Sequence, residues 1–527
     1  MSIAQHVKVL LTSDRARVRA PVNVSTITFF VVLALFSAGL VFAFARAVDE
    51  WNWVAWLVLP LMSANAVWIS GGAATSLTGL MIPRSSTPVL PTGWKPRTKT
   101  SVLITICGEA PERTADYLHG FVCDLERHDL DNSIEIFVLS DTSVPVACVR
   151  EDDAFASLVS QGKITLRRRA VRTNRKPGNI AAWFNDSRHA FDHMVVLDAD
   201  SRMSSDAIFR LIWEMENQPG LGLCQAGISL IPGRTWFGRY QRITSRLLSR
   251  TFGRGFAAWS GDAGNYWGHN AIIRIAAFRS CVKLPELSGN APWGGSILSH
   301  DFIEAAWIRR AGWSVKLLPE VAGSAEDAPQ TVDEFFARDR RWCQGNLQHL
   351  RLLFDPGLHP LSRFHLLTGI FSYLAAPIWL ILLAVLSSEL IMVWGFLPIV
   401  SIAIVLLVPK VCALIETLPR ANTHTRRRVL WKSWVYELVL STMLAPIIML
   451  RQALFVGAVM LGRDCGWKSN SKTELKLPLG WPEAALGTGL LTLTIMNGAS
   501  GAFWLALVII PLMLAPFILP KLNEVAV

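Results

Sequence analysis

The stretch Met194-Val195-Val196-Leu197-Asp198-Ala199-Asp200-Ser201 decides the fold of this chain. Its apolar residues are typical of a strand that is buried on both faces of a parallel sheet. Open α/β sheets bind ligands at the carboxyl ends of their strands, where Asp198 and Asp200 stand. Two carboxylates suit Mg²⁺ or Mn²⁺ that shares its coordination shell with substrate phosphates. Because Asp-x-Asp pairs also occur in solvated turns, the neighbouring sequence must decide between these interpretations.

Strand and helix patterns alternate on both sides of this stretch. We expect strands at residues 100–107, 134–140, 164–169 and 194–197, and helices at residues 115–127 and 180–189. Strands that alternate with helices indicate a parallel, doubly wound sheet. Asp141 follows the second strand as Asp198 follows the fourth, and this repeated placement favours a nucleotide site at that edge of the sheet.

A basic segment lies between these strands. It begins at Arg167-Arg168-Arg169 and continues to Arg175-Lys176-Pro177-Gly178-Asn179. One interpretation is a solvated basic loop. The other is a diphosphate site, because Lys and Arg supply the cations that a diphosphate needs. Gly178 would also let the backbone approach a ligand closely.

Three further segments carry candidate chemistry. In Tyr266-Trp267-Gly268-His269-Asn270-Ala271, His269 is either a hydrogen-bonded structural histidine or part of a site. In Ser296-Ile297-Leu298-Ser299-His300-Asp301-Phe302, Asp301 is either a helix N-cap or a general base. Residues 333–350 predict an amphipathic helix with Arg338-Asp339-Arg340-Arg341-Trp342. That helix either lies on a membrane surface or binds a pyrophosphate through Arg and a sugar ring through Trp342.

The composition indicates a membrane protein with one inserted domain. Of the 527 residues, 51% are hydrophobic and 17% are charged, and the mean hydropathy is +0.35, which is too apolar for an ordinary soluble enzyme. Uncharged runs at residues 27–45 and 53–81 are each long enough to cross about 30 Å of hydrocarbon. Residues 82–363 are polar, and a domain of that size can bury its own core.

Basic residues predict the orientation. Arg15, Arg17 and Arg19 precede the first apolar run, so the positive-inside rule places the N-terminus and the inserted domain in the cytoplasm. No small-residue cleavage site follows that run, so we expect a membrane span and no cleavable signal peptide. The net charge of +11 fits this bias, attraction to anionic lipid and an acidic substrate. No basic helix interleaved with aromatics occurs, which argues against nucleic acid as a partner.

The candidate residues stand in the order of a known pattern: Asp141, Asp198 with Asp200, Asp301, and Arg341 with Trp342. This order resembles the family 2 processive glycosyltransferases of GT-A fold, found in cellulose and hyaluronan synthases. The local sequence at residues 266–274, 296–302 and 338–343 is similar to that of one branch, the glucosyltransferase H family of osmoregulated periplasmic glucan synthesis. The resemblance covers residues 101–387.

The resemblance implies a GT-A domain with a Rossmann-like mixed sheet, inserted in a helical membrane bundle with about seven or eight crossings. It implies an inverting, processive transfer of glucose from UDP-glucose to a growing glucan, with a β-1,2 backbone, and export across the bacterial inner membrane. Asp301 would be the general base. Asp198 and Asp200 would hold Mg²⁺ or Mn²⁺, which neutralises the leaving diphosphate.

The resemblance also implies binding residues and partners. Those for the nucleotide sugar are Glu109, Asp141, Lys176, Asn179, Asp198, Arg338 and Arg341. Those for the acceptor are Trp342, Trp267, His269 and His300. Beyond the donor, the glucan and the lipid bilayer, it allows an acyl carrier protein and periplasmic glucan-processing proteins as partners.

Three features depart from the family's pattern. Arg338 stands where the QxxRW motif has Gln, although this branch tolerates a basic residue there. Gly108-Glu109 replaces the Asn-Glu of the synthases. The N-terminal cytoplasmic extension of some members is nearly absent, which puts any role of that extension in doubt.

The membrane segments after the domain follow the apolar runs. We expect spans at residues 364–386, 390–415 and 434–450, and a hairpin at residues 484–498 and 503–519. Residues 452–461 are too short to cross and predict a re-entrant segment. The basic stretch that follows, with Trp467, is either a gating loop or a plain interhelical loop. Glu437 and Arg451, at or near membrane depth, are expected to face the bundle interior or a water-filled path. Three tryptophans either line a polysaccharide channel or anchor the interface: Trp379, Trp394 and Trp504.

We therefore expect seven segments: cytoplasmic 1–26, two membrane helices in 27–81, the GT-A domain 82–333, interfacial helices 334–363, membrane helices 364–461, a candidate gating loop 462–483 and a membrane hairpin 484–527. Two other functions are compatible with this division. One is a family 2 membrane glycosyltransferase with a different sugar, linkage or lipid acceptor. The other is a non-catalytic nucleotide-sugar-binding subunit, against which the intact Asp198, Asp301 and Trp342 argue.

Overall fold

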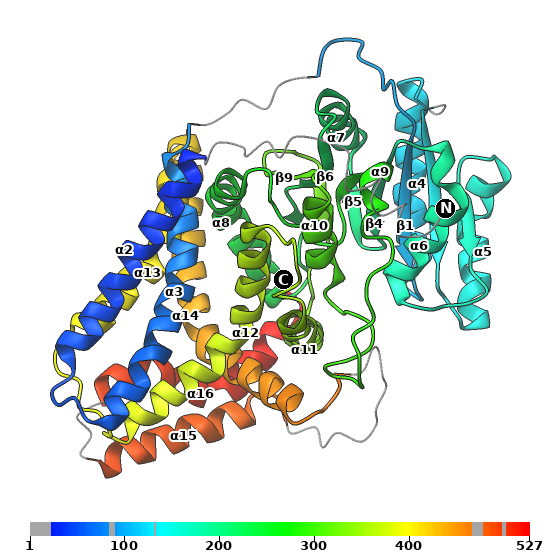
Figure 1. Ribbon diagram of the computed structural model, residues 1–527. Coiled ribbons are helices and arrows are strands. Elements are labelled where there is room, and N and C mark those ends of the chain that lie inside the picture. Colours follow the sequence, from blue (N-terminus) through cyan, green and yellow to red (C-terminus); the bar gives the residue numbers. More distant parts are fainter. Residues whose placement is uncertain (1–22, 84–89, 131–132, 466–477, 498–501, 527) are drawn as a thin grey trace.

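The protein joins a bundle of long apolar helices to an α/β domain (Figure 1). The computed structural model describes residues 23–83, 90–130, 133–465, 478–497 and 502–526. The blue helices of the first apolar runs stand on one side of the molecule, and the sheet of the domain stands on the other. Apolar helices precede and follow the domain in the sequence, as the hydropathy predicts.

A seven-stranded mixed sheet forms the centre of the domain, in the order β3-β2-β1-β4-β8-β6-β9. The strands are β1 Thr100–Ile106, β2 Ile134–Ser140, β3 Thr165–Arg168, β4 His193–Asp198, β6 Leu221–Ala226, β8 Ala271–Arg274 and β9 Ser314–Leu318. The mixed sheet of the GT-A fold is confirmed. A purely parallel sheet, which the alternation of strands and helices alone indicates, is not formed, because β8 runs antiparallel to β4 and β6.

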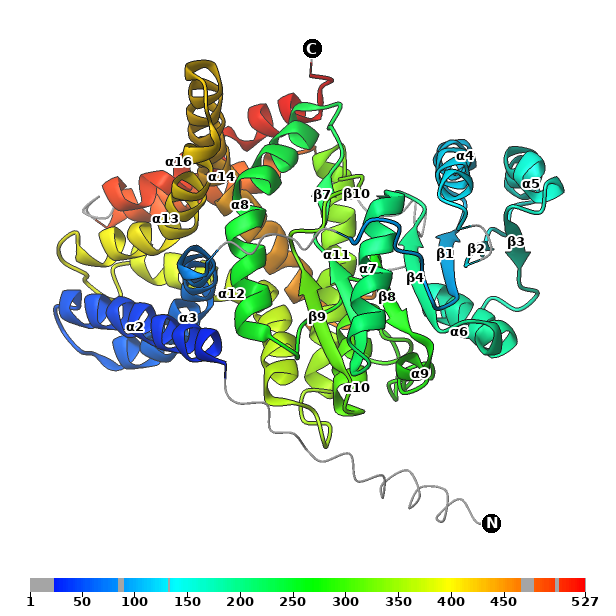
Figure 2. The same cartoon turned by 90° about the horizontal axis from the view of Figure 1, so that it is seen from above.

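Helices cover both faces of this sheet, as Figure 2 shows for α4, α5 and α6. One core contains α4 Pro111–Arg127, α5 Pro145–Ser160 and α7 Ser205–Asn217, and the other contains α6 Arg175–Ser187, α9 Ile275–Phe278 and α10 His300–Arg310. Val195 and Leu197 of β4 belong to the first core, whereas Met194 and Val196 belong to the second. This alternation confirms that the apolar run is a strand buried on both faces.

A three-stranded sheet continues from the Asp pair. Its order is β5-β10-β7, with β5 Ser201–Met203, β7 Ser229–Leu230 and β10 Ser324–Glu326. β5 begins directly after Asp200, and its antiparallel pairing places Glu326 opposite Ser201. A third carboxylate is thereby brought next to the Asp pair.

Six helices of the described residues are long and apolar enough to cross a membrane: α2 Val24–Ala47, α3 Trp53–Met81, α12 Pro360–Ser387, α13 Leu397–Thr417, α14 His424–Met460 and α16 Ala502–Asn523. A further apolar helix, α15 Trp481–Met496, has 16 residues. The re-entrant segment predicted at residues 452–461 is wrong, because these residues continue α14. Arg451 does not end the helix, since its guanidinium pairs with the buried Glu483 of α15. Most of the candidate gating loop, with Trp467, lies outside the described residues.

A long helix outside the elements expected from the sequence, α8 Trp236–Ser260, joins the bundle to the domain. It packs backbone against backbone on α3. A Cβ on Gly79 would lie 1.9 Å from the carbonyl oxygen of Thr251, and one on Gly255 would lie 1.8 Å from that of Thr75. Only glycine permits this approach. Because α8 also contacts β7 and β9, it fixes the sheet on the membrane helices.

Candidate active site

The carboxyl ends of β2, β1 and β4 lie at one edge of the sheet. Two of the predicted carboxylates, Asp141 and Asp198, lie at this edge. In the pairing registers, Ile106 of β1 lies opposite Ser140 of β2, and Thr105 lies opposite Asp198 of β4. Asp141 follows Ser140, so Asp141 and Asp198 flank the end of β1 from both sides. This is the edge at which open α/β sheets bind ligands.

Lys176 connects the basic segment to the Asp pair. Its Nζ contacts Asp198 Oδ1 and donates to the carbonyl oxygen of Gly268 at 2.7 Å. Thr105 Oγ1 donates to the same carboxylate at 3.1 Å. Burial opposes ionisation of Asp198, but the charges of Lys176 and His269 and these hydrogen bonds outweigh burial and hold its pKa below the usual range. Lys176 therefore stands in the site and not in a solvated loop.

Asp200 carries negative charge that nothing nearby neutralises fully. Its side chain reaches the surface, yet the surrounding protein limits its hydration. That limited hydration, together with the negative charges of Asp198 and Glu326, raises the pKa of Asp200 to about 6. A divalent cation at this position would offset the repulsion.

His269 lies beside the Asp pair in a network of its own. Its Nε2 is 3.0 Å from Glu326 Oε2, and its Nδ1 is 3.1 Å from Ser201 Oγ. Burial lowers the pKa of His269, but the Glu326 hydrogen bond and the charge of Asp198 outweigh burial and raise it to about 9. The imidazole is therefore positively charged at neutral pH, as in a structural ion pair. Its predicted contact with an acceptor stays a prediction.

The residues present fit a divalent cation that substrate oxygens help to hold. Within the described ranges, no three His, Cys, Asp or Glu side chains converge on a metal position. Mg²⁺ commonly takes only one or two carboxylates and completes its shell with water and phosphate oxygens. Asp198 and Asp200 provide those carboxylates, and a cation would balance the repulsion of Asp200 by Asp198 and Glu326.

Asp141 has a partner that the sequence does not reveal. Arg169 donates to both oxygens of its carboxylate, from Nε at 2.7 Å and from Nη2 at 2.6 Å. Arg169 also donates to the carbonyl oxygen of Arg175 at 2.9 Å. The predicted contact of Asp141 with a nucleotide therefore has to be made by a carboxylate already paired with arginine.

Replacing Arg169 with Ala should destabilise the protein. The Arg169 and Asp141 side chains are only 6% and 11% exposed, and removing one partner of a buried pair costs about 3–5 kcal/mol. We expect a Tm in detergent several degrees below that of the wild type. The matched control is Arg167→Ala, because its partner Asp186 is 64% exposed and such pairs contribute at most about 1 kcal/mol. Equal Tm values for the two variants would contradict this expectation.

Asp301 faces the same glycine that Lys176 binds. Its Oδ2 lies 3.7 Å from the place that a Cβ on Gly268 would occupy, and Gly268 has a φ of +87°. Ser299, and not Asp301, is the N-cap residue of α10, which removes the N-cap interpretation of Asp301. Burial raises the pKa of Asp301, and Glu304 adds to this effect. A partly buried carboxylate with a raised pKa beside Gly268 can accept a proton.

The other predicted acceptor residues make protein contacts. His300 Nδ1 lies 3.1 Å from Glu304 Oε1, one turn along α10. The backbone N–H of Trp267 donates to Gln225 Oε1 at 3.0 Å, and its ring is partly exposed. Binding of an acceptor by Trp267 and His300 stays a prediction.

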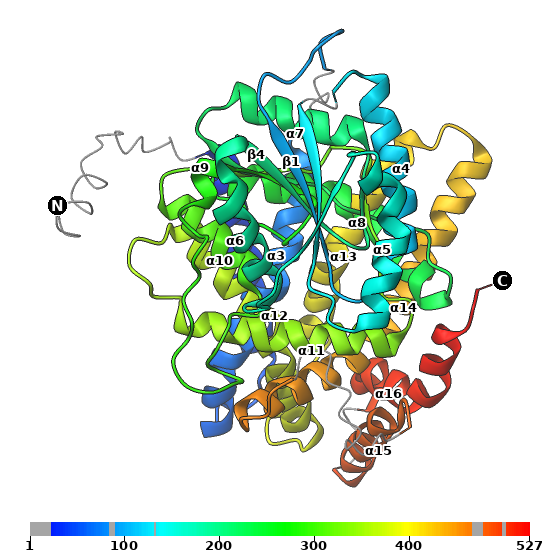
Figure 3. The same ribbon diagram turned by 90° about the vertical axis from the view of Figure 1, so that its right-hand side faces the viewer.

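Helix α11, Val332–Gln348, carries the Arg and Trp motif and confirms the helix expected there. It lies between the sheet and the hairpin of α15 and α16 (Figure 3). The Arg338 guanidinium stacks 4.4 Å from the centre of the Trp342 ring, which is 46% exposed and so open to a ligand. Burial lowers the pKa of Arg341, and the nearby charges of Arg338 and Arg175 add to that effect. The motif therefore lies close to the basic segment.

Glu109 and Asn179 lie at the ends of neighbouring elements. Glu109 accepts a hydrogen bond from the backbone N–H of Cys107, which closes the turn after β1. Asn179, in the first turns of α6, is buried, and its Oδ1 has no hydrogen-bond partner among the described residues. The predicted binding of a nucleotide sugar by Glu109 and Asn179 stays a prediction.

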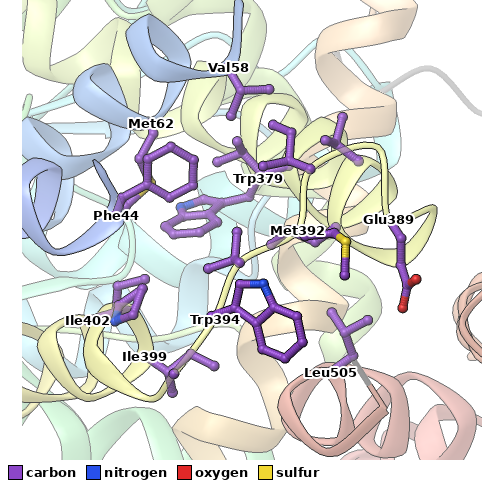
Figure 4. A pocket seen from close by; sticks show the side chains of 17 residues that line it. Phe44, Val58, Met62, Trp379, Glu389, Met392, Trp394, Ile399, Ile402 and Leu505 are labelled. Atoms are coloured by element: carbon purple, nitrogen blue, oxygen red, sulfur yellow. The ribbon is translucent and has the colours of Figure 1, made fainter. Parts of the chain in front are cut away.

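A separate cavity of about 300 Å³ lies in the bundle (Figure 4). Trp379 of α12 and Trp394 of the α12–α13 connection lie in its lining, with Phe44 of α2 and Met62 of α3. Among the described residues, the lining is mostly apolar, with Glu389 as its one charged side chain. It lacks the carboxylates and cations that surround Asp198, so we assign no catalysis to it. The predicted role of Trp379 and Trp394 in a polysaccharide path stays a prediction.

Several site residues were missed by reasoning from the sequence. Glu326 reaches the Asp pair only through the pairing of β10 with β5, and Thr105 only through the pairing of β1 with β4. Neither pairing has a local signal. Arg169 lies in the basic segment that the sequence singles out, but its pairing with Asp141 has no local signal either.

Two family models match the chain. The model described as Glycosyl transferase family 2 matches residues 101–281, and the model described as Glycosyl transferase family group 2 matches residues 193–415. Together these segments contain the candidate residues from Asp141 to Trp342. Among solved structures, a mannosyltransferase from Pyrobaculum calidifontis in complex with GDP-Man and Mn²⁺ has a TM-score of 0.45 and 16% identity, covering 76% of this chain and 97% of that chain. Nothing further follows from a likeness of that size.

Curated relatives with high similarity are named glucans biosynthesis glucosyltransferase H. One from Vibrio cholerae is 37% identical over 457 residues, which cover 81% of this chain. The match spans 63% of that relative, which is less than two thirds of its length. One from Rhodopseudomonas palustris is 35% identical over 521 residues, covering 90% of this chain and 71% of the relative. The chain therefore belongs to the family 2 glycosyltransferases, in the group of the glucans biosynthesis glucosyltransferases H.

Proposed function

We propose that this protein is an inverting, processive glucosyltransferase that uses UDP-glucose to build a β-1,2-linked glucan and exports it across the bacterial inner membrane. The observation that carries the proposal is the meeting of three groups at one glycine. Lys176 binds Asp198 and the carbonyl of Gly268, and Asp301 faces Gly268. A cation for a diphosphate, a carboxylate for a metal and a partly buried base then belong to one site. The names of the relatives support glucose and a glucan product.

In this proposal the donor lies along the carboxyl edge of the sheet. The nucleotide lies at Asp141, and Lys176 and Arg341 stabilise the negative charge of the leaving diphosphate. Mg²⁺ or Mn²⁺ held by Asp198 and Asp200 would supply a Lewis acid for the same diphosphate. Three further residues contact the nucleotide sugar: Glu109, Asn179 and Arg338.

The acceptor approaches from the side of Asp301. The carboxylate takes the proton of the acceptor hydroxyl as the new bond to the sugar forms. Attack on the face opposite the leaving group inverts the anomeric carbon, so an α-linked donor yields a β-linkage. The exposed Trp342 ring stacks on the apolar face of the acceptor sugar. Three residues complete the acceptor contacts: Trp267, His269 and His300.

The proposal places the domain in the cytoplasm and the glucan path in the bundle. The basic residues Arg426, Arg427 and Arg428 begin α14 next to the end of α13, and that end of α13 contacts α8 through Glu416 and Arg254 at 2.8 Å. Basic residues at the domain side of the helices support a cytoplasmic domain. The proposal does not extend to an acyl carrier protein or to periplasmic glucan-processing proteins.

The pH dependence of turnover tests the base. Asp301 acts only when ionised, and burial raises its pKa. The value of kcat/KM is therefore expected to fall as the pH drops through that raised pKa, above the value of about 4 of a free Asp. A pH–rate profile of UDP release measures this. An acid limb at or below pH 4 would speak against Asp301 as the base.

A comparison of donors tests the function. The purified chain in detergent with Mg²⁺ is given UDP-glucose, UDP-galactose, UDP-N-acetylglucosamine or GDP-mannose, and nucleotide release is measured. We expect UDP-glucose to give the highest kcat/KM. A higher value with another donor would favour a transferase of different sugar specificity. Binding of UDP without turnover of any donor would favour a non-catalytic subunit.

A further inference from the structure

The helix that carries the Arg and Trp motif also contacts the residues just before Asp301. His349, directly after α11, is fully buried, and its Nε2 lies 2.8 Å from the carbonyl oxygen of Ser299. A carbonyl only accepts, so Nε2 carries the proton. Burial lowers the pKa of His349 to about 4, which keeps the ring neutral. The ring also packs against Phe302, at 5.6 Å between ring centres. His349 thus contacts the chain on both sides of Asp301.

Gln348 and Gly345, both in α11, contact the same segment that leads into α10. Gln348 Oε1 accepts a hydrogen bond from the backbone N–H of Leu298 at 3.0 Å. Its Nε2 donates to the carbonyl oxygens of Pro292 and Gly294 at 3.2 and 3.4 Å. Gly345 lies so close that an added Cβ would be 2.6 Å from the backbone nitrogen of Ser299. The last turns of α11 therefore hold the segment before α10 in place.

The opposite side of α11 is fixed to membrane helices. The buried Asp339 accepts hydrogen bonds from Tyr373 of α12 at 2.9 Å and from Gln452 of α14 at 3.1 Å. Cys343 packs into a core with Ile370 of α12 and with α14. One helix thus connects the bundle, the exposed Trp342 and the turn that carries Asp301.

We propose that His349 is a positioning residue for Asp301: by holding Ser299 and Phe302, it fixes the first turn of α10 at the place where the base meets the acceptor. This inference rests on the proposed function, in which Asp301 is the base. His349 touches neither donor nor acceptor in this account and acts only through α10. A displacement of about 1 Å at a catalytic group can lower a rate by about 10²-fold. Loss of the one hydrogen bond from His349 to this turn can therefore lower the rate of turnover.

Two variants separate the hydrogen bond from the ring. His349→Phe keeps a ring against Phe302 and removes the donor, whereas His349→Gln keeps a donor near the position of Nε2. The matched control is His365→Phe, because His365 is also buried and its Nε2 also lies 2.9 Å from a carbonyl oxygen, that of Ala263. The full chain in detergent is assayed for kcat, KM for UDP-glucose, UDP affinity and hydrogen exchange of peptides that span residues 298–304.

We expect His349→Phe to lower kcat by about 10- to 100-fold, with KM and UDP affinity within about twofold of the wild type. Exchange at residues 298–304 should rise by about tenfold or more, and His349→Gln should recover most of both losses. A His349→Phe variant that matches the His365→Phe control in kcat and exchange would overturn the proposal. So would a parallel loss of UDP affinity that Gln does not rescue. If the wild type turns over no donor, the proposed function fails, and the exchange data alone still decide whether His349 holds α10.

Discussion

Replacing Asp301 with Asn is expected to lower kcat by about 10²–10⁴-fold, the range that general base catalysis contributes. Asn has nearly the same shape, so the fold and the contact with Gly268 should persist. It cannot take a proton from an acceptor hydroxyl. Asp301 is poised for that role because burial raises its pKa, and because its side chain faces the glycine whose carbonyl binds Lys176. UDP binding should be unchanged, because no donor group contacts Asp301 in the proposed arrangement.

The matched control for this change is Asp206→Asn. Asp206 is also in the first turn of a helix, α7, but it is exposed. Its variant should keep the wild-type kcat, and both variants should keep the wild-type Tm within a few degrees. An Asp301→Asn protein that is folded, binds UDP and retains full turnover would remove Asp301 as the base.

Replacing Asp200 with Asn should lower metal-dependent turnover by about 10³-fold. Limited hydration raises the pKa of Asp200 to about 6, and the negative charges of Asp198 and Glu326 add to this effect. The amide removes one carboxylate that a divalent cation would bind, and Lewis-acid stabilisation of several kcal/mol corresponds to roughly 10³-fold in rate. We expect a loss of that size in kcat/KM at a fixed Mg²⁺ concentration. Direct titration with Mn²⁺ in the presence of UDP should show weaker metal binding.

Chelation and a surface variant control for this result. Removing divalent cations from the wild type should reproduce the loss, and adding Mg²⁺ back should reverse it. Asp262→Asn removes a half-exposed carboxylate that pairs with Lys316 at 3.2 Å, and it should leave both Mn²⁺ binding and turnover unchanged. Full activity of the wild type in a chelator would contradict a metal at Asp198 and Asp200.

The parts of the fold that are determined by local sequence patterns were predictable. The apolar run before Asp198 is a buried strand because both of its faces are apolar, and residues 134–140 form a strand at the predicted bounds. The long uncharged runs form helices of membrane length for the same reason. The division of the chain into seven segments, with a cytoplasmic domain, stays a prediction.

Other parts of the fold depend on contacts between distant residues. The direction of β8 is set by its partners β4 and β6 and not by its four residues. Helix α8 is stabilised by close packing on α3 at Gly79 and Gly255, which no periodicity marks. The span expected at residues 434–450 continues to Met460 in α14, where Arg451 pairs with Glu483 within the bundle.

The candidate site also has a part that the sequence predicts and a part that depends on contacts between distant residues. The types and order of residues from Asp141 to Trp342 were enough to indicate a site and a family. Their partners were not predictable, because Arg169, Glu326 and His349 each reach the site through tertiary packing. These partners contact Asp141, His269 and the turn before Asp301, and so hold the predicted residues in place.

The most direct test of the central claim is the structure of the product. The purified chain is incubated with UDP-[¹³C]glucose and Mg²⁺, and the polymer is examined by NMR and by linkage analysis. The proposed function predicts a β-anomeric glucan with 1,2-linkages that is absent with Asp301→Asn. An α-anomeric product, or a glucan of a different linkage from the same site, would contradict the proposed inverting β-1,2-glucan synthesis.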